Sequence, residues 1–207
     1  VFSDKDTQRN AQEYFTGLKL IKQKAQEHDV PFWAVVQAGN YVSGNIVRDT
    51  KDTAYMTDGM TRWTVHTALA YGAQGITYYP LVQPYSYSLQ KNWIGTTKST
   101  YNYDRNGIIG ADGTTTPYYE YIKNVNRQIT AVDEVLMNAA DCGVVVTEAS
   151  TAASDTGITN YGYGALTHLT STGSAGAMAG CFNYFGRNAY HAVNYDYNNP
   201  QDITLYF

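Results

Sequence analysis

Amide and aromatic side chains follow two apolar runs of strand length in this sequence. Gln37, Asn40 and Tyr41 come after the run 32–36, and Tyr79 ends the second run. Side-chain amides can hydrogen-bond to the hydroxyl groups of a sugar, while a tyrosine ring can stack on the C–H face of the sugar ring. These residue types therefore indicate a carbohydrate surface. The structural alternative is that Gln37 pairs with loop backbone groups and Tyr79 fills space.

The segment that follows Tyr79 adds further aromatic residues. It is rich in Tyr, Ser, Thr and Asn as far as Thr116, and it contains Trp93. An aromatic cluster on such a long loop suits a stacking platform for a sugar, although the same residues could pack on one another. The predicted substrate-binding residues are therefore Gln37, Asn40, Tyr41, Tyr79 and Trp93.

Other kinds of catalytic site lack their sequence motifs. The four histidines stand apart from one another, and neither they nor Cys142 and Cys181 show the spacing of a metal site. The chain has no Gly-x-Ser-x-Gly element, and its glycine-containing stretches at 162–164 and 173–180 lack the Lys-Ser/Thr pair of a phosphate-binding loop. We therefore predict neither a metal nor a cofactor. The two cysteines are either free thiols or, in an exported protein, a disulfide.

Three predicted helices alternate with the two apolar runs. The second spans residues 57–71 and the third spans residues 117–136. The first lies before Val30 and carries an apolar stripe with spacings of three and four residues. This stripe consists of Ala11, Tyr14, Phe15, Leu18, Ile21 and Ala25.

The unbroken apolar runs are typical of strands covered on both faces, as in a parallel sheet. We therefore predict that residues 32–37 and 76–79 pair in parallel, with the helix at 57–71 between them in sequence. Long connections follow these strands and a short one precedes the second, which is the pattern of a barrel whose functional loops lie on one face. The order favours an α/β architecture, and specifically the C-terminal part of a (β/α)8 (TIM) barrel.

From about residue 139 the sequence changes to short apolar runs separated by Gly, Asn, Asp and Ser. These runs are 143–146, 165–169, 177–182, 189–195 and 203–207. They predict a small antiparallel β-sandwich domain at 139–207, after a C-terminal barrel portion at 1–138. No flexible linker separates the two parts, so we expect them to pack together.

Charge and hydropathy exclude two classes of partner. Lys and Arg number 14 against 18 Asp and Glu, and the net charge of −4 repels the phosphate groups of nucleic acid. No apolar run approaches the roughly 18 residues that span a membrane.

The first residues resemble neither an initiator segment nor a signal peptide, and the last residues alternate like a strand. We therefore expect the chain to be part of a longer polypeptide.

Several segments resemble β-galactosidase-like glycoside hydrolases of the type that gut bacteria secrete. PFWAVVQA at 31–38, MTRW at 60–63 and LAYGAQGITYY at 69–79 are similar to strand seven, helix seven and strand eight of that family's barrel. Later segments are similar to the last barrel helix and to the β-domain that follows it. These are residues 112–126, 180–182 and 190–195.

The resemblance implies hydrolysis of a β-linked carbohydrate by two carboxylates, in a protein that is secreted or exposed on a bacterial cell surface. It places the acid/base after strand four of the barrel. The remainder of the same polypeptide, with the N-terminal barrel strands, is therefore an expected partner. The resemblance also implies that the nucleophile is a Glu just before a Gln at the end of strand seven, where this chain has Val36 before Gln37. The catalytic residues are therefore unknown.

Three explanations of Val36 stay open, because no Asp or Glu occurs between Val30 and Arg48. The register differs from the family's, or a carboxylate from elsewhere acts as nucleophile, or the barrel binds sugar without cleaving it. The third explanation gives the alternative function, a non-catalytic carbohydrate-binding or cell-surface protein on a degenerate barrel. Carboxylates on the loops are more commonly turn or solvated residues. They are Asp49, Asp52, Asp104 and Asp112.

Overall fold

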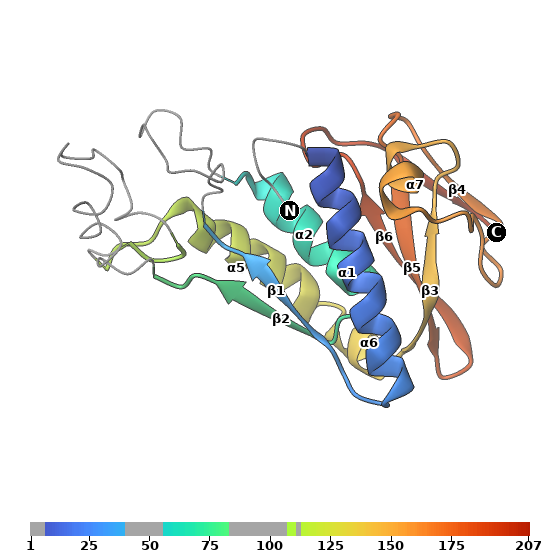
Figure 1. Cartoon of the computed structure of the whole chain (residues 1–207), viewed down its shortest axis with the longest axis horizontal. Helices are drawn as coiled ribbons and strands as arrows, with labels where there is room; N and C mark the ends of the chain where they lie inside the picture. The colour runs from blue at the N-terminus through green and yellow to red at the C-terminus, as the bar shows by residue number, and fades with distance from the viewer. Residues whose placement is uncertain (1–6, 40–55, 83–106, 111–112) are drawn as a thin grey trace.

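The computed structural model describes residues 7–39, 56–82, 107–110 and 113–207 (Figure 1). These residues form a mixed α/β fold with one parallel pair, β1–β2, and two antiparallel sheets, β3–β5–β6 and β4–β7. The elements in chain order are α1 (Thr7–Glu27), β1 (Trp33–Gln37), α2 (Asp58–Ala70), β2 (Gly75–Tyr79), α5 (Pro117–Thr130), α6 (Asp133–Asn138), β3 (Ala140–Val146), α7 (Thr151–Thr156), β4 (His168–Ser171), β5 (Ala177–Tyr184), β6 (Arg187–Asn194) and β7 (Ile203–Tyr206).

The predicted parallel pairing of the two apolar runs is confirmed. Trp33 of β1 lies opposite Gly75 of β2, and Gln37 lies opposite Tyr79 at the other end of the pair. The Ala38 amide extends the ladder by donating to the Tyr79 carbonyl oxygen at 2.7 Å. The helix between the strands is α2.

Helix α2 begins and ends at residues whose chemistry explains its length. The Thr57 hydroxyl accepts from the Met60 amide at 3.2 Å and so satisfies one of the free amides of the first turn. After Tyr71 the chain turns through Gly72, whose φ of +88° is a conformation that glycine adopts without steric cost. The short link that follows leads directly into β2.

One face of the parallel pair packs on helices. Val36 is 1% exposed and joins Val65 and Leu69 of α2 and Val125 of α5 in one apolar cluster. Tyr78 lies against the same cluster, and its hydroxyl donates to the Asn126 side chain of α5 at 2.7 Å. This contact holds β2 against α5.

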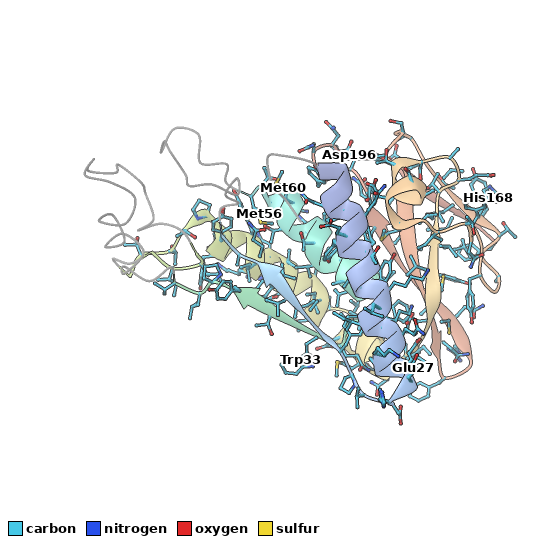
Figure 2. All side chains as sticks on the ribbon, in the orientation of Figure 1. Glu27, Trp33, Met56, Met60, His168 and Asp196 are labelled. Atoms are coloured by element: carbon cyan, nitrogen blue, oxygen red, sulfur yellow. The ribbon has the colours of Figure 1, made fainter. Side chains whose placement is uncertain are left out.

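The opposite face of the pair, which we call the open face, is exposed. It consists of Trp33, Val35, Gln37, Thr77 and Tyr79, and the first, second and last of these are 68, 71 and 67% exposed. Figure 2 shows Trp33 at the outer edge of the molecule. The prediction that both faces are covered is therefore wrong for the described part of the chain, because the helices in contact with the pair lie on the same side of it.

Helix α1 packs through a stripe that differs at one position from the predicted one. Phe15 and Leu18 are buried, but Ile21 is 50% exposed. Lys22 takes the inward position in its place, since its ammonium group lies 2.5 Å from the Asp141 carboxylate of β3. An ion pair with a neighbouring strand thus orients the last turns of α1.

The predicted third helix is two helices in the structure. Helix α5 ends at Thr130, and α6 starts at Asp133. Val132 lies at the break with φ −131° and ψ 11°, which is not a helical conformation, and it is 43% exposed. β-Branched residues such as Thr130 and Val132 form helices less readily than most, which is consistent with a break at this place.

The predicted antiparallel pairing of the later apolar runs is confirmed. β5 is the central strand, with β3 and β6 on either side, and β4 pairs with β7. Alternate residues of β5 face opposite ways. Ala179 and Cys181 pack against Leu169 of β4 and Leu205 of β7, while Met178 faces the helices. Helices α1 and α2 therefore lie between this sheet and the parallel pair (Figure 1).

Helix α2 and the antiparallel sheet approach each other closely at Gly180 of β5. A Cβ atom at this position would lie against the Ala70 carbonyl oxygen and 2.7 Å from the Ala70 Cα, at the end of α2. We expect Gly180→Ala to lower the free energy of unfolding by about 1–3 kcal/mol through overpacking, as measured by urea denaturation. The control is Gly17→Ala on α1, where nothing lies within 4 Å and stability should hold or rise. Equal stability of the two variants would contradict this contact.

Candidate functional site

The candidate site lies at the carboxyl ends of β1 and β2, on the open face. Gln37 and Tyr79 are cross-strand neighbours there, at the last pair of the ladder. The Gln37 Nε2 donates to the Gly39 carbonyl oxygen at 3.1 Å, so part of its hydrogen-bonding capacity is used by the backbone just after β1. Its carboxamide oxygen and the Tyr79 ring remain as the polar and the stacking group of this end of the pair.

Three of the predicted site residues, Asn40, Tyr41 and Trp93, lie outside the described residues. The loop carboxylates suggested by the sequence also lie outside them. The structure therefore brings together two members of the predicted set, Gln37 and Tyr79. Their proximity follows directly from the parallel register of the strands.

Tyr78 and Tyr79 are adjacent in sequence but play different parts. Tyr78 faces α5, and burial raises the pKa of its phenol to about 12. Its hydrogen bond to Asn126 makes it an anchor of the strand. Tyr79 points the opposite way, onto the open face, where its ring is accessible to a ligand. The peptide bond between Tyr79 and Pro80 is cis.

Val36 faces away from the candidate site. Its side chain is surrounded by Val65, Leu69 and Val125 in the helix layer. A carboxylate at this position would be buried among apolar groups, where the charged form is strongly disfavoured. The residue of this strand end that does reach the open face is Gln37, which is neutral. Within β1 and β2 neither face carries an Asp or Glu.

A second cluster joins residues that the sequence left apart. His66 of α2 and His191 of β6 lie with Nδ1 and Nε2 3.2 Å apart. The His66 Nε2–H donates to the Gln128 carboxamide oxygen of α5, also at 3.2 Å. This bond leaves Nδ1 of the neutral His66 ring as an acceptor for the His191 Nε2–H. The interpretation of all four histidines as isolated is therefore wrong, and no local motif could have revealed a pair 125 residues apart.

Both rings favour the neutral state. Burial lowers the pKa of His66, and the positive charge of Arg62 lowers it further, although the bond to Gln128 acts in the opposite direction. Burial lowers the pKa of His191 to about 4, with His66 as the second cause. Within the described ranges no three His, Cys, Asp or Glu side chains gather as a metal site.

The histidine pair borders a pocket of about 550 Å³ whose other wall is the loop after β6. The polar groups of that loop form hydrogen bonds with other residues of the same loop. Asn194 donates to the Asn199 carbonyl oxygen at 2.9 Å, and the Asp196 carboxylate accepts from the amides of Asn198 and Asn199. These groups therefore stabilise the loop, and the open face is the better candidate for ligand binding.

Comparison with known proteins does not identify a function for this chain. No protein-family model matches the chain, and no curated protein matches it. None of the described helices combines the length and the apolar character needed to cross a membrane.

Proposed function

We propose that this chain forms part of the sugar-binding wall of a β-galactosidase-like glycoside hydrolase that acts on a β-linked carbohydrate. The observation that carries the proposal is the pairing of Gln37 with Tyr79 at the carboxyl ends of two parallel strands. An amide and an accessible aromatic ring at opposed positions of neighbouring strands suit the hydroxyl groups and the C–H face of one sugar ring. In (β/α)8 enzymes the substrate binds at this end of the strands.

The open face supports the barrel part of the proposal. In a (β/α)8 barrel the helices cover the outside, and the inward side chains of the strands fill the interior. The pair β1–β2 has helices on one side only, and Trp33 and Val35 expose apolar side chains on the other. Further strands from the remainder of the same polypeptide would cover these side chains. The proposed partners are therefore those strands and the carbohydrate, in a secreted or cell-surface bacterial protein.

Hydrolysis would require two carboxylates on either side of the glycosidic bond. β1 and β2 supply neither of them. In the proposed enzyme they come from other strands or loops of the barrel, and Gln37 and Tyr79 position the sugar ring between them. Their contribution is binding and orientation rather than proton transfer or nucleophilic attack.

A second candidate function is a barrel that binds a glycan without cleaving it. Two observations favour it: Val36 is buried against the helices, and the side chain on the open face at this strand end is the neutral amide of Gln37. An amide has no ionised oxygen with which to form a glycosyl ester, so this strand end binds but does not attack.

Oligosaccharide binding to the full-length polypeptide tests the site. We expect Tyr79→Ala to weaken binding by on the order of 1–3 kcal/mol, because the stacking surface of an accessible ring is lost. Isothermal titration calorimetry with β-linked oligosaccharides measures the change. Tyr119→Ala is the matched control, since Tyr119 is 40% exposed on α5 and does not belong to the open face. Unchanged affinity in both Tyr79→Ala and Gln37→Ala, with folding intact, would place the sugar site elsewhere.

A hydrolysis assay on the same polypeptide separates the two functions. Release of reducing sugar that falls in Tyr79→Ala supports the hydrolase. Binding that is sensitive to Tyr79 without any release of sugar supports the non-catalytic barrel.

A further inference from the structure

Two cysteines lie opposite each other in the antiparallel sheet. β3 pairs with β5 so that Asp141 faces Phe182 and Gly143 faces Cys181, which leaves Cys142 as an extra residue on β3. This is a β-bulge, in which two residues of one strand oppose one residue of the other. Cys142 and Gly143 therefore share Cys181 as their partner, and the two cysteines are cross-strand neighbours.

Both cysteine side chains lie on the same face of the sheet. Cys181 is 0% exposed, within the apolar cluster between β5 and the β4–β7 sheet. Cys142 is partly buried and packs against that same cluster. In a regular strand the residue before the one opposite Cys181 would point to the other face. The bulge reverses this alternation and brings the two thiols together.

The separation expected for such a pair is close to that of a disulfide. Directly opposed residues in antiparallel strands have Cβ atoms about 4.5–5.5 Å apart, and Cys142 is next to Gly143, the residue directly opposed to Cys181. A disulfide holds its Cβ atoms about 3.5–4.5 Å apart. A small shift of β3 is therefore needed. Gly143 lies at the bulge with φ +138°, and nothing lies within 4 Å of the place where its Cβ would be. The backbone has room for the shift at this position.

The surroundings of the two thiols differ. Burial raises the pKa of Cys181 to about 12, and the neighbouring Cys142 acts in the same direction. Cys142 is the more accessible of the two. Its thiol donates to the Ala140 carbonyl oxygen at 3.4 Å. An oxidant from solution therefore reacts first with Cys142. Cys181, inside the sheet, is the thiol that then attacks the Cys142 sulfur.

We propose that Cys142 and Cys181 are a redox site that closes to an intramolecular disulfide when the protein meets a disulfide oxidant. In the first step the Cys142 thiolate attacks one sulfur of the oxidant, and the other sulfur leaves as a thiolate. In the second step Cys181 attacks the Cys142 sulfur, and its proton passes to the departing sulfur, so that the remaining half of the oxidant leaves as a thiol. The protein loses two protons and two electrons, and the oxidant disulfide becomes two thiols.

The closed site would join β3 to the central strand β5. It would also enclose α7 and β4 within a covalent loop, which constrains the unfolded chain. We therefore expect the oxidised protein to resist denaturant better than the reduced protein. This stabilisation is independent of sugar binding at the open face.

Incubation of the folded protein with oxidised glutathione tests the proposal. We expect the intact mass to fall by two hydrogens, both cysteines to resist maleimide after denaturation, and a peptide pair linked through Cys142 and Cys181 to be recovered. Dithiothreitol should reverse all three changes. The denaturant midpoint of the oxidised protein should lie above that of the reduced protein.

Cys181→Ala is the informative variant, because it retains the accessible thiol and lacks the resolving one. We expect it to accumulate a stable glutathione adduct on Cys142, which the wild type resolves. A persistent Cys142 adduct in the folded wild type would overturn the proposal. So would a linked peptide that forms only in denaturant, or a link between two chains.

Discussion

Replacing Phe15 with alanine is expected to lower the free energy of unfolding by about 3–5 kcal/mol. Phe15 is 2% exposed, and its ring lies in contact with aromatic rings from two other parts of the chain. The centroid distances are 5.6 Å to Trp63, 5.6 Å to Tyr71 and 6.0 Å to Tyr195. Trp63 belongs to α2, Tyr71 is its C-terminal cap, and Tyr195 follows the last residue of β6. Truncation of Phe15 would leave a cavity where α1 packs against α2 and against the segment that follows β6.

Urea denaturation followed by far-UV circular dichroism measures the change, with the denaturant dependence checked for two-state behaviour. Ile21→Ala is the control, since Ile21 lies on the same helix but is 50% exposed. We expect that variant to lose much less stability than Phe15→Ala. A similar loss in both variants would show that helix propensity rather than the aromatic cluster determines the contribution of α1.

Acidification is expected to remove on the order of 2–3 kcal/mol of stability through the His66–His191 pair. The pKa of His191 falls from an ordinary 6.5 to about 4 in the folded protein. Between pH 6.5 and about pH 4, His191 is protonated in the unfolded chain but stays neutral in the folded chain. The contribution of His191 is therefore complete above pH 6.5 and is lost progressively down to about pH 4.

The groups around the pair act in two directions. Burial and the positive charge of Arg62 on α2 lower the pKa of His66, and the hydrogen bond with Gln128 of α5 raises it, with burial the largest cause. Protonation of Nδ1 of His66 also removes the acceptor of the hydrogen bond from His191. The contact between α2 and β6 is thus sensitive to acid through both rings.

Denaturant titrations at pH values between 7 and 4 measure this loss for the wild type and for His191→Gln. The variant should start lower in stability and should lose less of it as the pH falls. His168→Gln is the control, because His168 is exposed on β4 and stacks on Tyr206. Its pH dependence should match that of the wild type. Parallel curves for the wild type and His191→Gln would exclude the pair as an acid-sensitive contact.

The elements of the fold were largely predictable, because they depend on neighbours in sequence. The Thr57 cap and the Gly72 turn bound α2, and the period of apolar residues distinguishes α1 from the strands. The parallel pairing of β1 with β2 was also predictable, since an intervening helix and a short return link leave few other arrangements. Of the predicted site, the proximity of Gln37 and Tyr79 follows from that pairing alone.

The exceptions among the elements have non-local causes. Lys22 replaced Ile21 on the inward face of α1 because a carboxylate on β3 lies within reach of its ammonium group. The apolar run of β1 predicted burial on both faces, yet the run itself does not contain the layer that would cover the second face. An apolar pattern shows which residues favour burial, and the rest of the fold determines which of them are buried.

By itself, the sequence determined α1, α2, α5 and the strands with their alternation, because these follow from the local periodicity of apolar residues and from turn chemistry. It predicted one helix where α5 and α6 lie, and it did not predict α7. Only the tertiary structure decided that Val36 faces the helices and that Gln37 faces the open side. It likewise decided that His66 meets His191, and that a bulge places Cys142 beside Cys181. Each of these contacts joins residues brought together by packing, and the orientation of a side chain toward a distant partner leaves no trace in the local pattern.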